Sequence, residues 1–306
     1  MNLGHKNILI IKLNNNEFEQ FYNKKIAEFG IDVWDIESLR THKTKQPIRN
    51  MLSSMRCFWD KEIRNSISKY DHIIIFEDQG LVPIISLIKR KKANIILWNW
   101  NIMPFKKAKR ENMFFRLCQI WTFDKSDARK YGWKFNEQFY FRPENVRKVK
   151  NNIPIAFCAC ADKNRYTIMK KIYDELEKEN IICDFYCVKD KDKKYEVEDQ
   201  FLIDEPLGYE MFLKHVKNSD IIVDIVQEGQ NGITVRVLEA LFYNKKLITN
   251  NKSIVNMPFY NSYIYVYGYD NNISFSEFLQ LRGCKYDEET KKRYTFESWL
   301  ANFEFN

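Results

Sequence analysis

The stretch that most constrains the fold is residues 220–251, which read DIIVDIVQEGQNGITVRVLEALFYNKKLITNN. Its apolar run 221–226 is too short for a helix and rich in β-branched residues, so it predicts a buried strand. A polar loop with two glycines follows, and Thr234 is a natural N-cap for a segment with helical apolar spacing. A second strand is predicted at 247–249. Strand, loop, helix and strand form a parallel βαβ unit, whose ligands bind beyond the carboxyl ends of the strands.

The same alternation of strands and helices runs through the whole chain. Strands are predicted at 7–13, 72–76, 94–98, 121–123, 155–160, 182–188, 201–203, 221–226, 247–249 and 264–267. Helices are predicted at 16–30, 48–70, 82–90, 105–118, 165–178, 208–218, 234–243, 274–281 and 295–303. Such alternation is typical of α/β proteins with parallel sheets.

The length of the chain and a change in its composition predict two domains. The chain has 306 residues, more than a single core usually serves. Between 142 and 154 it turns polar and irregular, with Pro143 and two asparagines ahead of a new strand. We therefore expect domains at 1–150 and 151–306, each an α/β unit.

The composition indicates the cellular compartment and the redox state of the cysteines. No apolar run approaches the ~18 residues that span a bilayer, and Lys12 interrupts the apolar N-terminal segment, so a cytoplasmic protein is expected. The 7 cysteines are odd in number and lie mostly in apolar runs, which favours reduced core thiols over a disulfide framework.

The two halves of the chain differ in charge. Residues 1–150 hold 29 Lys and Arg against 16 Asp and Glu, whereas residues 151–306 hold 20 against 25. A basic first half suggests an anionic partner such as nucleic acid, an acidic membrane surface or a phosphorylated substrate. A merely soluble, lysine-rich surface is an equally acceptable interpretation.

Two loops of the second half are candidates for phosphate binding. In the first, Asp162, Lys163 and Arg165 lie between a strand and a helix N-terminus, where free N–H groups and the helix dipole favour an anion. A capped surface turn is the competing interpretation. The second is the glycine loop, with binding candidates at Gln227, Gly229, Gly232 and Thr234 and a catalytic candidate at Glu228.

The helix after the glycine loop offers a candidate for ribose. Arg236 and Glu239 are three residues apart and share a helix face. A carboxylate there is able to accept both ribose hydroxyls of a nucleotide. An ordinary salt bridge between the two side chains is the alternative, and the sequence does not separate them.

In the first half, Glu77 and Asp78 directly follow a predicted buried strand. Either is a candidate general base for an acceptor hydroxyl, and a solvated turn is the alternative. Other chemistries lack their motifs: Asn14 to Asn16 stand where a dinucleotide fingerprint needs glycines, there is no P-loop, and no zinc-like cysteine spacing occurs. We expect neither a metal nor a cofactor.

Five stretches resemble two-domain GT-B glycosyltransferases, especially bacterial enzymes of lipopolysaccharide and capsule biosynthesis. They are FDKSDARKYG (123–132), CADKNRYTIMKKIYDEL (160–176), CDFY (183–186), and DIVQEGQNGITVRVLEAL (224–241) with KKLITNN (245–251). The resemblance implies two Rossmann-like domains with a cleft between them, a donor site in the second, an acceptor site in the first, and a C-terminal helix crossing back. It also implies that the glycine loop and following helix hold the donor's sugar, phosphates and ribose.

The resemblance departs from the family at one point. Many retaining members carry two glutamates eight residues apart, but Asn231 stands eight residues before Glu239, with Glu228 three positions earlier. An inverting, metal-independent transferase is therefore expected, hexosyltransferase-like, moving a sugar from a nucleotide sugar, expected to be UDP-linked, to a surface glycan.

Two rivals stay open. A non-catalytic nucleotide-sugar-binding or scaffold subunit of a polysaccharide assembly complex would bind the donor without transferring it. A nucleic-acid-binding protein would use the basic half, but no nucleic-acid-binding module is recognisable and the acidic second half argues against it. The basic runs 89–92 and 106–107 instead suggest peripheral contact with the cytoplasmic face of the inner membrane, or with a lipid-linked acceptor.

Overall fold

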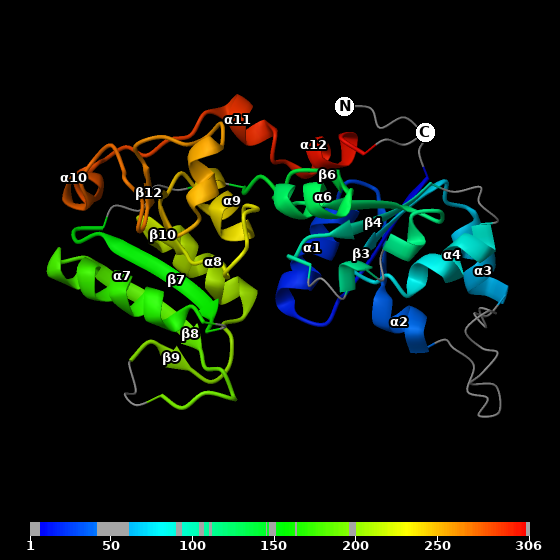
Figure 1. The fold of residues 1–306 in the computed structure, drawn as a ribbon, viewed down its shortest axis with the longest axis horizontal. Helices are drawn as coiled ribbons and strands as arrows, with labels where there is room; N and C mark the ends of the chain where they lie inside the picture. The colour runs from blue at the N-terminus through cyan, green and yellow to red at the C-terminus, as the bar shows by residue number, and fades with distance from the viewer. Residues whose placement is uncertain are drawn as a thin grey trace. The chain divides into compact units, whose positions relative to one another are not determined.

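The computed structural model describes residues 7–41, 61–89, 94–103, 107–109, 112–144, 146, 151–162, 164–195 and 200–303. The chain forms two compact units, each built around its own sheet (Figure 1). Unit 1 comprises residues 1–137 with 301–306, and unit 2 comprises residues 138–300. Each unit is described by itself below.

Unit 1 is a parallel α/β layer structure. Its six-stranded sheet has the order β2-β1-β3-β4-β5-β6. The strands are β1 (Ile8–Lys12), β2 (Asp32–Asp35), β3 (His72–Phe76), β4 (Asn94–Asn99), β5 (Gln119–Thr122) and β6 (Lys134–Phe135). All pair in parallel, and β1, β3 and β4 are almost wholly buried, which explains their continuous apolar sequences.

The helices of unit 1 follow the predicted positions in part. They are α1 (Glu17–Ala27), α2 (Ile36–Thr41), α3 (Lys61–Ser68), α4 (Leu81–Lys89) and α6 (Lys125–Tyr131), with the 3₁₀ turn η1 (Asn112–Phe114). The continuous helix predicted at 105–118 is wrong, because Asn112–Phe114 forms η1 and a turn follows it. The predicted helix at 48–70 is confirmed only over α3, and residues 48–60 lie outside the described part.

Unit 2 repeats this architecture with a second six-stranded parallel sheet, of order β12-β11-β10-β7-β8-β9. Its strands are β7 (Ile155–Ala161), β8 (Ile182–Val188), β9 (Leu202–Ile203), β10 (Ile221–Asp224), β11 (Lys246–Thr249) and β12 (Ile264–Val266). The βαβ unit predicted at 220–251 is confirmed as β10, α9 and β11, with β10 and β11 paired in parallel.

Most helices of unit 2 bury apolar residues. The helices of this unit are α7 (Tyr166–Lys178), α8 (Tyr209–Asn218), α9 (Val235–Phe242), α10 (Phe275–Gln280), α11 (Glu288–Lys292) and α12 (Phe296–Ala301), with η2 (Lys252–Asn256). Met169, Ile172 and Leu176 of α7 are fully buried at the spacing expected of one helix face. They join a core that also holds residues of β7, β8 and β10.

The division between the units lies at 137/138, earlier than the predicted boundary near 150. Phe139, Tyr140 and Phe141 belong to unit 2 because they are buried against it. Tyr140 N donates to the carbonyl of Tyr294 at 2.8 Å, and the Phe139 ring lies 4.4 Å from that of Trp299.

The chain returns to unit 1 at its end. Ala301, the last residue of α12, belongs to unit 1 together with the residues that follow. Phe303 packs its ring 5.0 Å from Trp121 and 6.0 Å from Trp98, and Asn302 Nδ2 donates to Asn136 Oδ1 at 3.0 Å.

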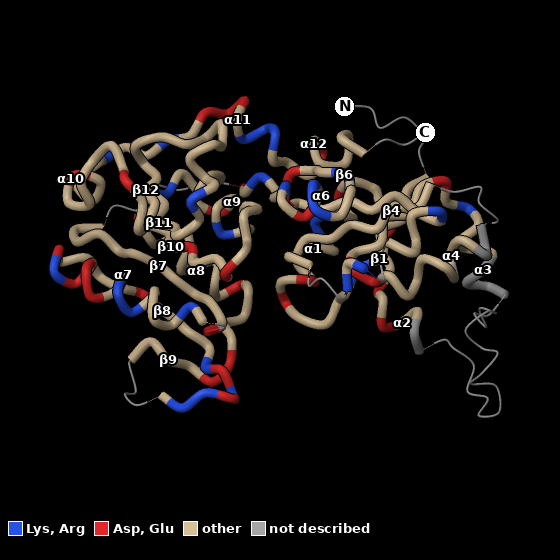
Figure 2. The backbone as a smooth tube through the Cα atoms, viewed as in Figure 1, with Lys and Arg blue, Asp and Glu red and all other residues tan. Residues whose placement is uncertain are grey.

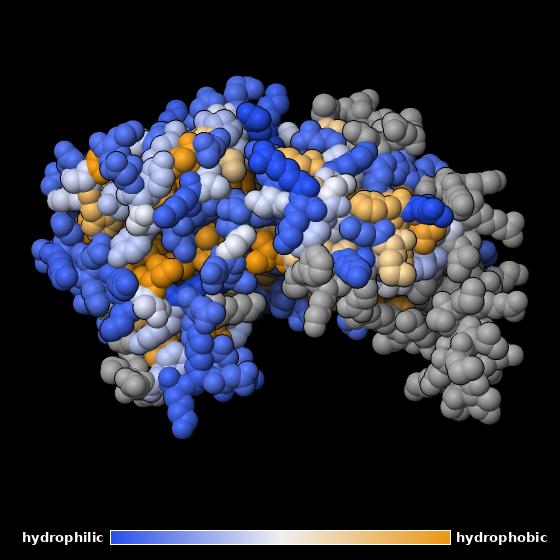
Figure 3. All heavy atoms as spheres, viewed as in Figure 1, coloured by the Kyte–Doolittle hydropathy of each residue, from blue (hydrophilic) through white to orange (hydrophobic). Residues whose placement is uncertain are grey.

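On the face shown in Figure 3, the described residues are mostly hydrophilic. Lys and Arg are interspersed with Asp and Glu along both units (Figure 2). Within the described residues, no helix is long and apolar enough to cross a membrane. Large apolar side chains are exposed at scattered positions, among them Met113, Phe115, Ile153, Ile182 and Met211.

Candidate functional site

The sheet of unit 2 has one place where its strand order reverses. The chain begins at β7, adds β8 and β9 on one side, and then continues with β10, β11 and β12 on the other. The connection after β7 therefore runs towards β8, and the connection after β10 runs in the opposite direction, towards β11. In open α/β sheets, ligands bind in the crevice that this reversal creates.

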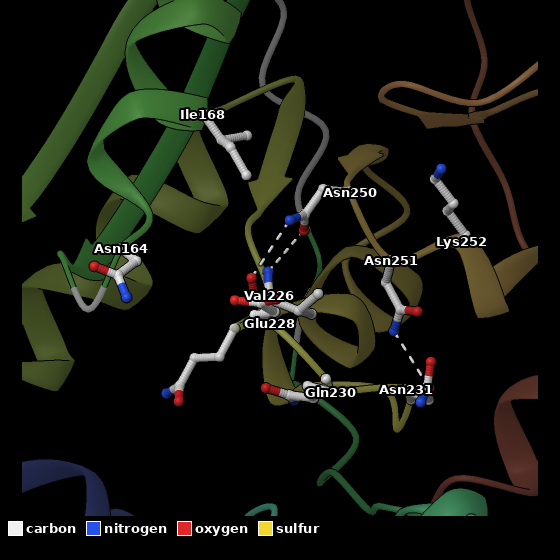
Figure 4. A pocket seen from close by; sticks show the side chains of 11 residues that line it. Asn164, Ile168, Val226, Glu228, Gln230, Asn231, Asn250, Asn251 and Lys252 are labelled. Carbon is white, nitrogen blue, oxygen red and sulfur yellow. Dashed lines mark hydrogen bonds between the residues drawn. The ribbon is translucent and has the colours of Figure 1, made fainter.

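A pocket of about 560 Å³ lies at this place. It is formed by three segments, each following the carboxyl end of a parallel strand. Figure 4 shows Asn164 and Lys252 at opposite sides of the pocket, with the loop after β10 between them. The lining residues are Asn164, Ile168, Val226, Gln227, Glu228, Gly229, Gln230, Asn231, Asn250, Asn251 and Lys252.

The loop after β10 is held in one conformation by its own turn. Gln230 N donates to the Gln227 carbonyl at 3.1 Å, which closes a turn with Gly229 at φ +82°. An added Cβ at Gly229 would meet nothing within 4 Å, so glycine is required for the backbone angle and not for space. The predicted loop residues Gln227, Glu228 and Gly229 all line the pocket.

Asparagines after β11 hold the same loop from the other side (Figure 4). Asn250 Oδ1 accepts from Val226 N at 2.8 Å. Asn251 Nδ2 donates to the carbonyls of Asn231 and Gly232 at 3.4 and 3.3 Å. Gly232 is buried beneath the loop and does not line the pocket.

Thr234 and Asp224 join the glycine loop to the sheet below the pocket. Thr234 caps α9 by accepting from Val237 N at 3.3 Å, and its hydroxyl donates to Asp224 Oδ1 at 2.9 Å. Thr249 donates to the second oxygen of Asp224 at 3.1 Å. Burial raises the pKa of the Asp224 carboxyl, and the two hydroxyl donors oppose that shift. Thr234 thus positions α9 and does not line the pocket.

Arg236 and Glu239 form an ion pair in which the carboxylate is buried and the guanidinium is partly exposed. Arg236 Nη1 lies 2.6 Å from Glu239 Oε2, Tyr209 donates to Glu239 Oε1 at 2.9 Å, and the guanidinium lies 3.6 Å from the Phe212 ring centroid. Burial raises the pKa of Glu239, which is 0% exposed, and Arg236 opposes that shift. The salt bridge between the two side chains exists, and neither residue lines the pocket. A ribose contact by Glu239 stays a prediction that would require this pair to open.

The loop after β7 is tied to the loop after β8. Asp162 accepts from Tyr195 Oη at 2.6 Å and from Lys193 Nζ at 3.0 Å, and Lys193 also donates to Asn164 Oδ1 at 2.9 Å. Burial by itself would raise the pKa of Asp162, but these hydrogen bonds outweigh it and the pKa is lowered. Asp162 is therefore occupied by protein donors, while Lys193 brings a cation beside the pocket residue Asn164.

Lys163 and Arg165 are the two basic residues of this loop that were predicted to bind phosphate. Lys163 lies outside the described residues. Arg165 occupies the N-cap position of α7 without capping it, and its Nη1 lies 3.5 Å from the Ala161 carbonyl. It does not line the pocket, but it belongs to the loop that carries Asn164.

Of the two candidate general bases in unit 1, Glu77 and Asp78, Glu77 has the more unusual conformation and surroundings. It follows β3, next to β1, where the strand order of that sheet reverses. Its φ is +56°, a left-handed conformation that is costly for glutamate. Asn101 donates to Glu77 Oε1 at 2.8 Å. Burial raises the pKa of Glu77, although Asn101 and the charge of Lys107 oppose the shift.

Asp78, the neighbouring candidate, has an ordinary turn contact. Its Oδ1 accepts from Gly80 N at 2.9 Å, as expected of an acidic turn residue.

Lys12, which ends β1 beside Glu77, was not predicted as a site residue. Lys12 is fully buried, forms an ion pair with Glu19, and lies 4.8 Å from the Trp100 ring centroid. Burial lowers its pKa to about 7, and the charge of Glu77 acts in the opposite direction. The available signal was a lysine at the end of an otherwise apolar strand.

Asn250, Asn251 and Lys252 were also missed as site residues. They follow β11 as directly as the glycine loop follows β10, and the same rule for parallel sheets would have found them. Among the described residues, no group of three or more His, Cys, Asp or Glu side chains is arranged to hold a metal ion.

Comparisons with known proteins match the fold and not the sequence. No protein-family model and no curated protein sequence matches the chain. Among solved structures, the lipopolysaccharide outer core galactosyltransferase WaaB in its apo form aligns over 97% of each chain, with a TM-score of 0.54 at 12% identity. Anabaena HepE in complex with UDP-glucose aligns over 86% of each chain, with a TM-score of 0.52 at 12% identity. The two Rossmann-like domains are those of the GT-B glycosyltransferase fold.

Proposed function

We propose that this protein is a glycosyltransferase that takes a sugar from a uridine-linked nucleotide donor and adds it to a growing surface glycan of the lipopolysaccharide or capsule type. The observation that carries the proposal is the pocket at the β7/β10 reversal, which is lined by residues that follow β7, β10 and β11. Its polar lining of asparagines, glutamine and lysine suits sugar hydroxyls and phosphate oxygens. The fold shared with WaaB and with HepE, whose structures include one with UDP-glucose, supports the same conclusion.

The donor's diphosphate is the group that this pocket has to stabilise as it leaves. Helix N-termini supply unpaired N–H groups and the positive end of a dipole. Lys252 lines the pocket, Lys193 lies beside Asn164, and Arg165 is in the same loop. In our proposal these groups neutralise the developing charge, so that no metal ion is needed.

Glu77 is the general base of the proposed reaction. A carboxylate with a raised pKa takes up a proton more readily at neutral pH than an ordinary one does. The hydrogen bond from Asn101 fixes its orientation. Deprotonation of the acceptor hydroxyl by Glu77 and direct attack on the donor sugar give an inverting reaction, in which Glu228 has no covalent role.

A peripheral contact with anionic lipid is the proposed setting of unit 1. Met113 is 76% exposed and Phe115 is 46% exposed, and Lys109 and Arg116 flank them. Exposed apolar side chains among basic ones favour the surface of an anionic bilayer. The basic runs 89–92 and 106–107 were predicted for this role. Lys107 is the member of those runs whose side chain the structure describes.

A thermal-shift panel of uridine, cytidine and guanosine nucleotides tests the donor site. A nucleotide at a hundred times its dissociation constant should stabilise the protein by about 2.7 kcal/mol, a rise in Tm of roughly 5–10 °C for a domain of this size. Lys252→Met should reduce the shift, whereas Lys285→Met, at an exposed lysine outside the pocket, should not. The absence of a shift with any nucleotide would contradict a donor site.

Turnover separates the enzyme from a binding subunit. An enzyme releases the free nucleoside diphosphate from the bound donor, slowly with water and faster with an acceptor, and continues in excess EDTA if no metal is needed. Glu77→Gln should abolish acceptor-dependent release and leave the thermal shift unchanged. Binding without release under any of these conditions would favour the non-catalytic subunit.

A further inference from the structure

Three cysteines lie together on one face of the unit 2 sheet. β7 and β8 are neighbouring parallel strands, and their register places Cys160 opposite Cys187. Cys158 precedes Cys160 by two residues, so both side chains point to the same face. Cys158 and Cys187 are buried, whereas Cys160 is partly exposed. One accessible thiol thus stands beside two inaccessible ones.

The guanidinium of Arg165 completes the cluster. Arg165 lies five residues after Cys160, and its positive charge acts on the Cys160 sulfur. The two thiol donors, with the charge and hydrogen bond of Arg165, lower the pKa of Cys160 to about 4 despite burial. The pKa values of Cys158 and Cys187 are raised, chiefly because each faces the Cys160 sulfur. The charge of Arg165 thus favours the thiolate form of Cys160, the partly exposed member of the cluster.

This arrangement is that of a reactive thiolate with a resolving partner. Thiolates react with peroxides, thiols do so far more slowly, and partial exposure beside a cation marks the reactive kind. We propose that Cys160 is a peroxide-reactive thiol and that Cys187 resolves its oxidised form into a disulfide across β7 and β8.

The proposed chemistry balances with a hydroperoxide as the oxidant. The Cys160 thiolate attacks one peroxide oxygen, the O–O bond breaks, and a sulfenic acid forms while the second oxygen leaves as water after taking up a proton. The Cys187 sulfur then attacks the Cys160 sulfur. An S–S bond forms, the S–O bond breaks, and the hydroxyl leaves with the Cys187 proton as a second water. The two sulfurs supply the two electrons.

Strand geometry selects Cys187 over Cys158 as the partner. Neighbouring strands lie about 4.8 Å apart, within the roughly 4.4–6.8 Å between Cα atoms that a disulfide spans. Residues two apart on one strand are separated by about 6.6 Å, near the upper end of that range. The inference does not depend on the glycosyltransferase proposal, because it needs no nucleotide or acceptor.

Peptide mapping of the whole protein tests the disulfide. After treatment with hydrogen peroxide and alkylation of the remaining thiols, mass spectrometry should find a peptide containing Cys160 joined to one containing Cys187. In Cys187→Ser the linked peptide should be lost, and dimedone should trap a sulfenic acid at Cys160. Cys183→Ser, the matched control on β8, should keep the linked peptide. Absence of the linkage in the unsubstituted protein overturns the proposal.

The pH dependence of alkylation tests the thiolate without any oxidant. Iodoacetamide should modify Cys160 at rates that differ by less than about twofold between pH 6 and pH 8, whereas an ordinary thiol changes by roughly tenfold per unit. Arg165→Gln should slow the reaction at pH 6. An ordinary pH dependence at Cys160 in the unsubstituted protein would refute the assignment, whether or not any variant folds.

Discussion

Asn250 pairs with Val226 through both ends of its side-chain amide. Its Oδ1 accepts from Val226 N at 2.8 Å, and its Nδ2 donates to the Val226 carbonyl at 3.4 Å. The side chain thereby imitates a neighbouring strand and continues the pairing of β10 with β11 past the last ladder pair, Asp224 and Thr249. Asn250 thereby fixes the backbone of Val226, from which the glycine loop begins.

Asn250→Ala should uncouple the loop from the sheet. The loss of these hydrogen bonds should lower the free energy of unfolding by about 1 kcal/mol, and nucleotide affinity should fall roughly tenfold, equivalent to about 1.4 kcal/mol. Urea unfolding and calorimetric titration with UDP measure the two effects. Asn272→Ala, at an exposed position outside the pocket, should change neither. Unchanged UDP affinity in Asn250→Ala would show that the loop does not contact the nucleotide.

Gly229→Ala should strain the turn that faces the pocket. A non-glycine residue at φ +82° costs roughly 1–2 kcal/mol, so both stability and UDP affinity should fall. Gly283, at φ +72° and away from the pocket, provides the comparison. Gly283→Ala should cost similar stability without affecting UDP. Equal UDP affinities in the two variants would remove the glycine loop from the proposed donor site.

The Arg236 and Glu239 pair can be tested for a structural or a ribose role. Arg236→Met leaves a buried carboxylate without its partner and should cost roughly 3–5 kcal/mol. The double variant Arg236→Met with Glu239→Gln should recover part of that loss, because no uncompensated charge remains. We expect UDP affinity of the double variant within twofold of the original. A tenfold loss would instead support the ribose contact.

Lys12 should make stability rise with pH above neutrality. Its folded pKa of about 7 lies below the ordinary value of 10.5, so the unfolded chain binds more protons between these limits. The associated stability is fully present above 10.5 and is lost as pH falls through 7. The slope should approach about 1.4 kcal/mol per pH unit. Urea unfolding from pH 7 to 10 should show this slope in the original protein and its absence in Lys12→Met with Glu19→Gln. Parallel profiles would contradict it.

The exposed apolar residues of unit 1 should govern lipid binding. Met113→Glu with Phe115→Glu should weaken sedimentation with phosphatidylglycerol vesicles by at least about tenfold, since both apolar area and net positive charge are lost. Met211→Glu, which alters a side chain of unit 2 that is 48% exposed, should have little effect. If phosphatidylcholine vesicles bind equally well, the proposed electrostatic contribution is absent.

Local pattern was sufficient for most strands and most helices. The run 72–76 coincides with β3, because a strand buried on both faces leaves a continuous apolar run. The run 182–188 coincides with β8, which is only partly buried and is rich in apolar residues. Short elements with mixed sequences escaped prediction, including β2 (DVWD) and β6 (KF). These strands are set by pairing with the strand that precedes them, β1 for β2 and β5 for β6, and their own few residues carry little apolar pattern.

For the candidate site, the sequence by itself determined which loops follow the carboxyl ends of parallel strands, and so located Gln227, Glu228 and Gly229 at a pocket. Only the tertiary structure decided the partners of each charge. In the folded protein the buried Glu239 pairs with Arg236, and Asp162 accepts hydrogen bonds from Lys193 and Tyr195. Folding also brings Asn250 and Lys252 to the pocket. The spacing of apolar residues along a helix or strand follows from the local backbone, so it can be recognised from residues that are neighbours in the sequence. The partner of a buried charge is chosen by desolvation and by which side chain lies nearest in space, and that depends on strand order.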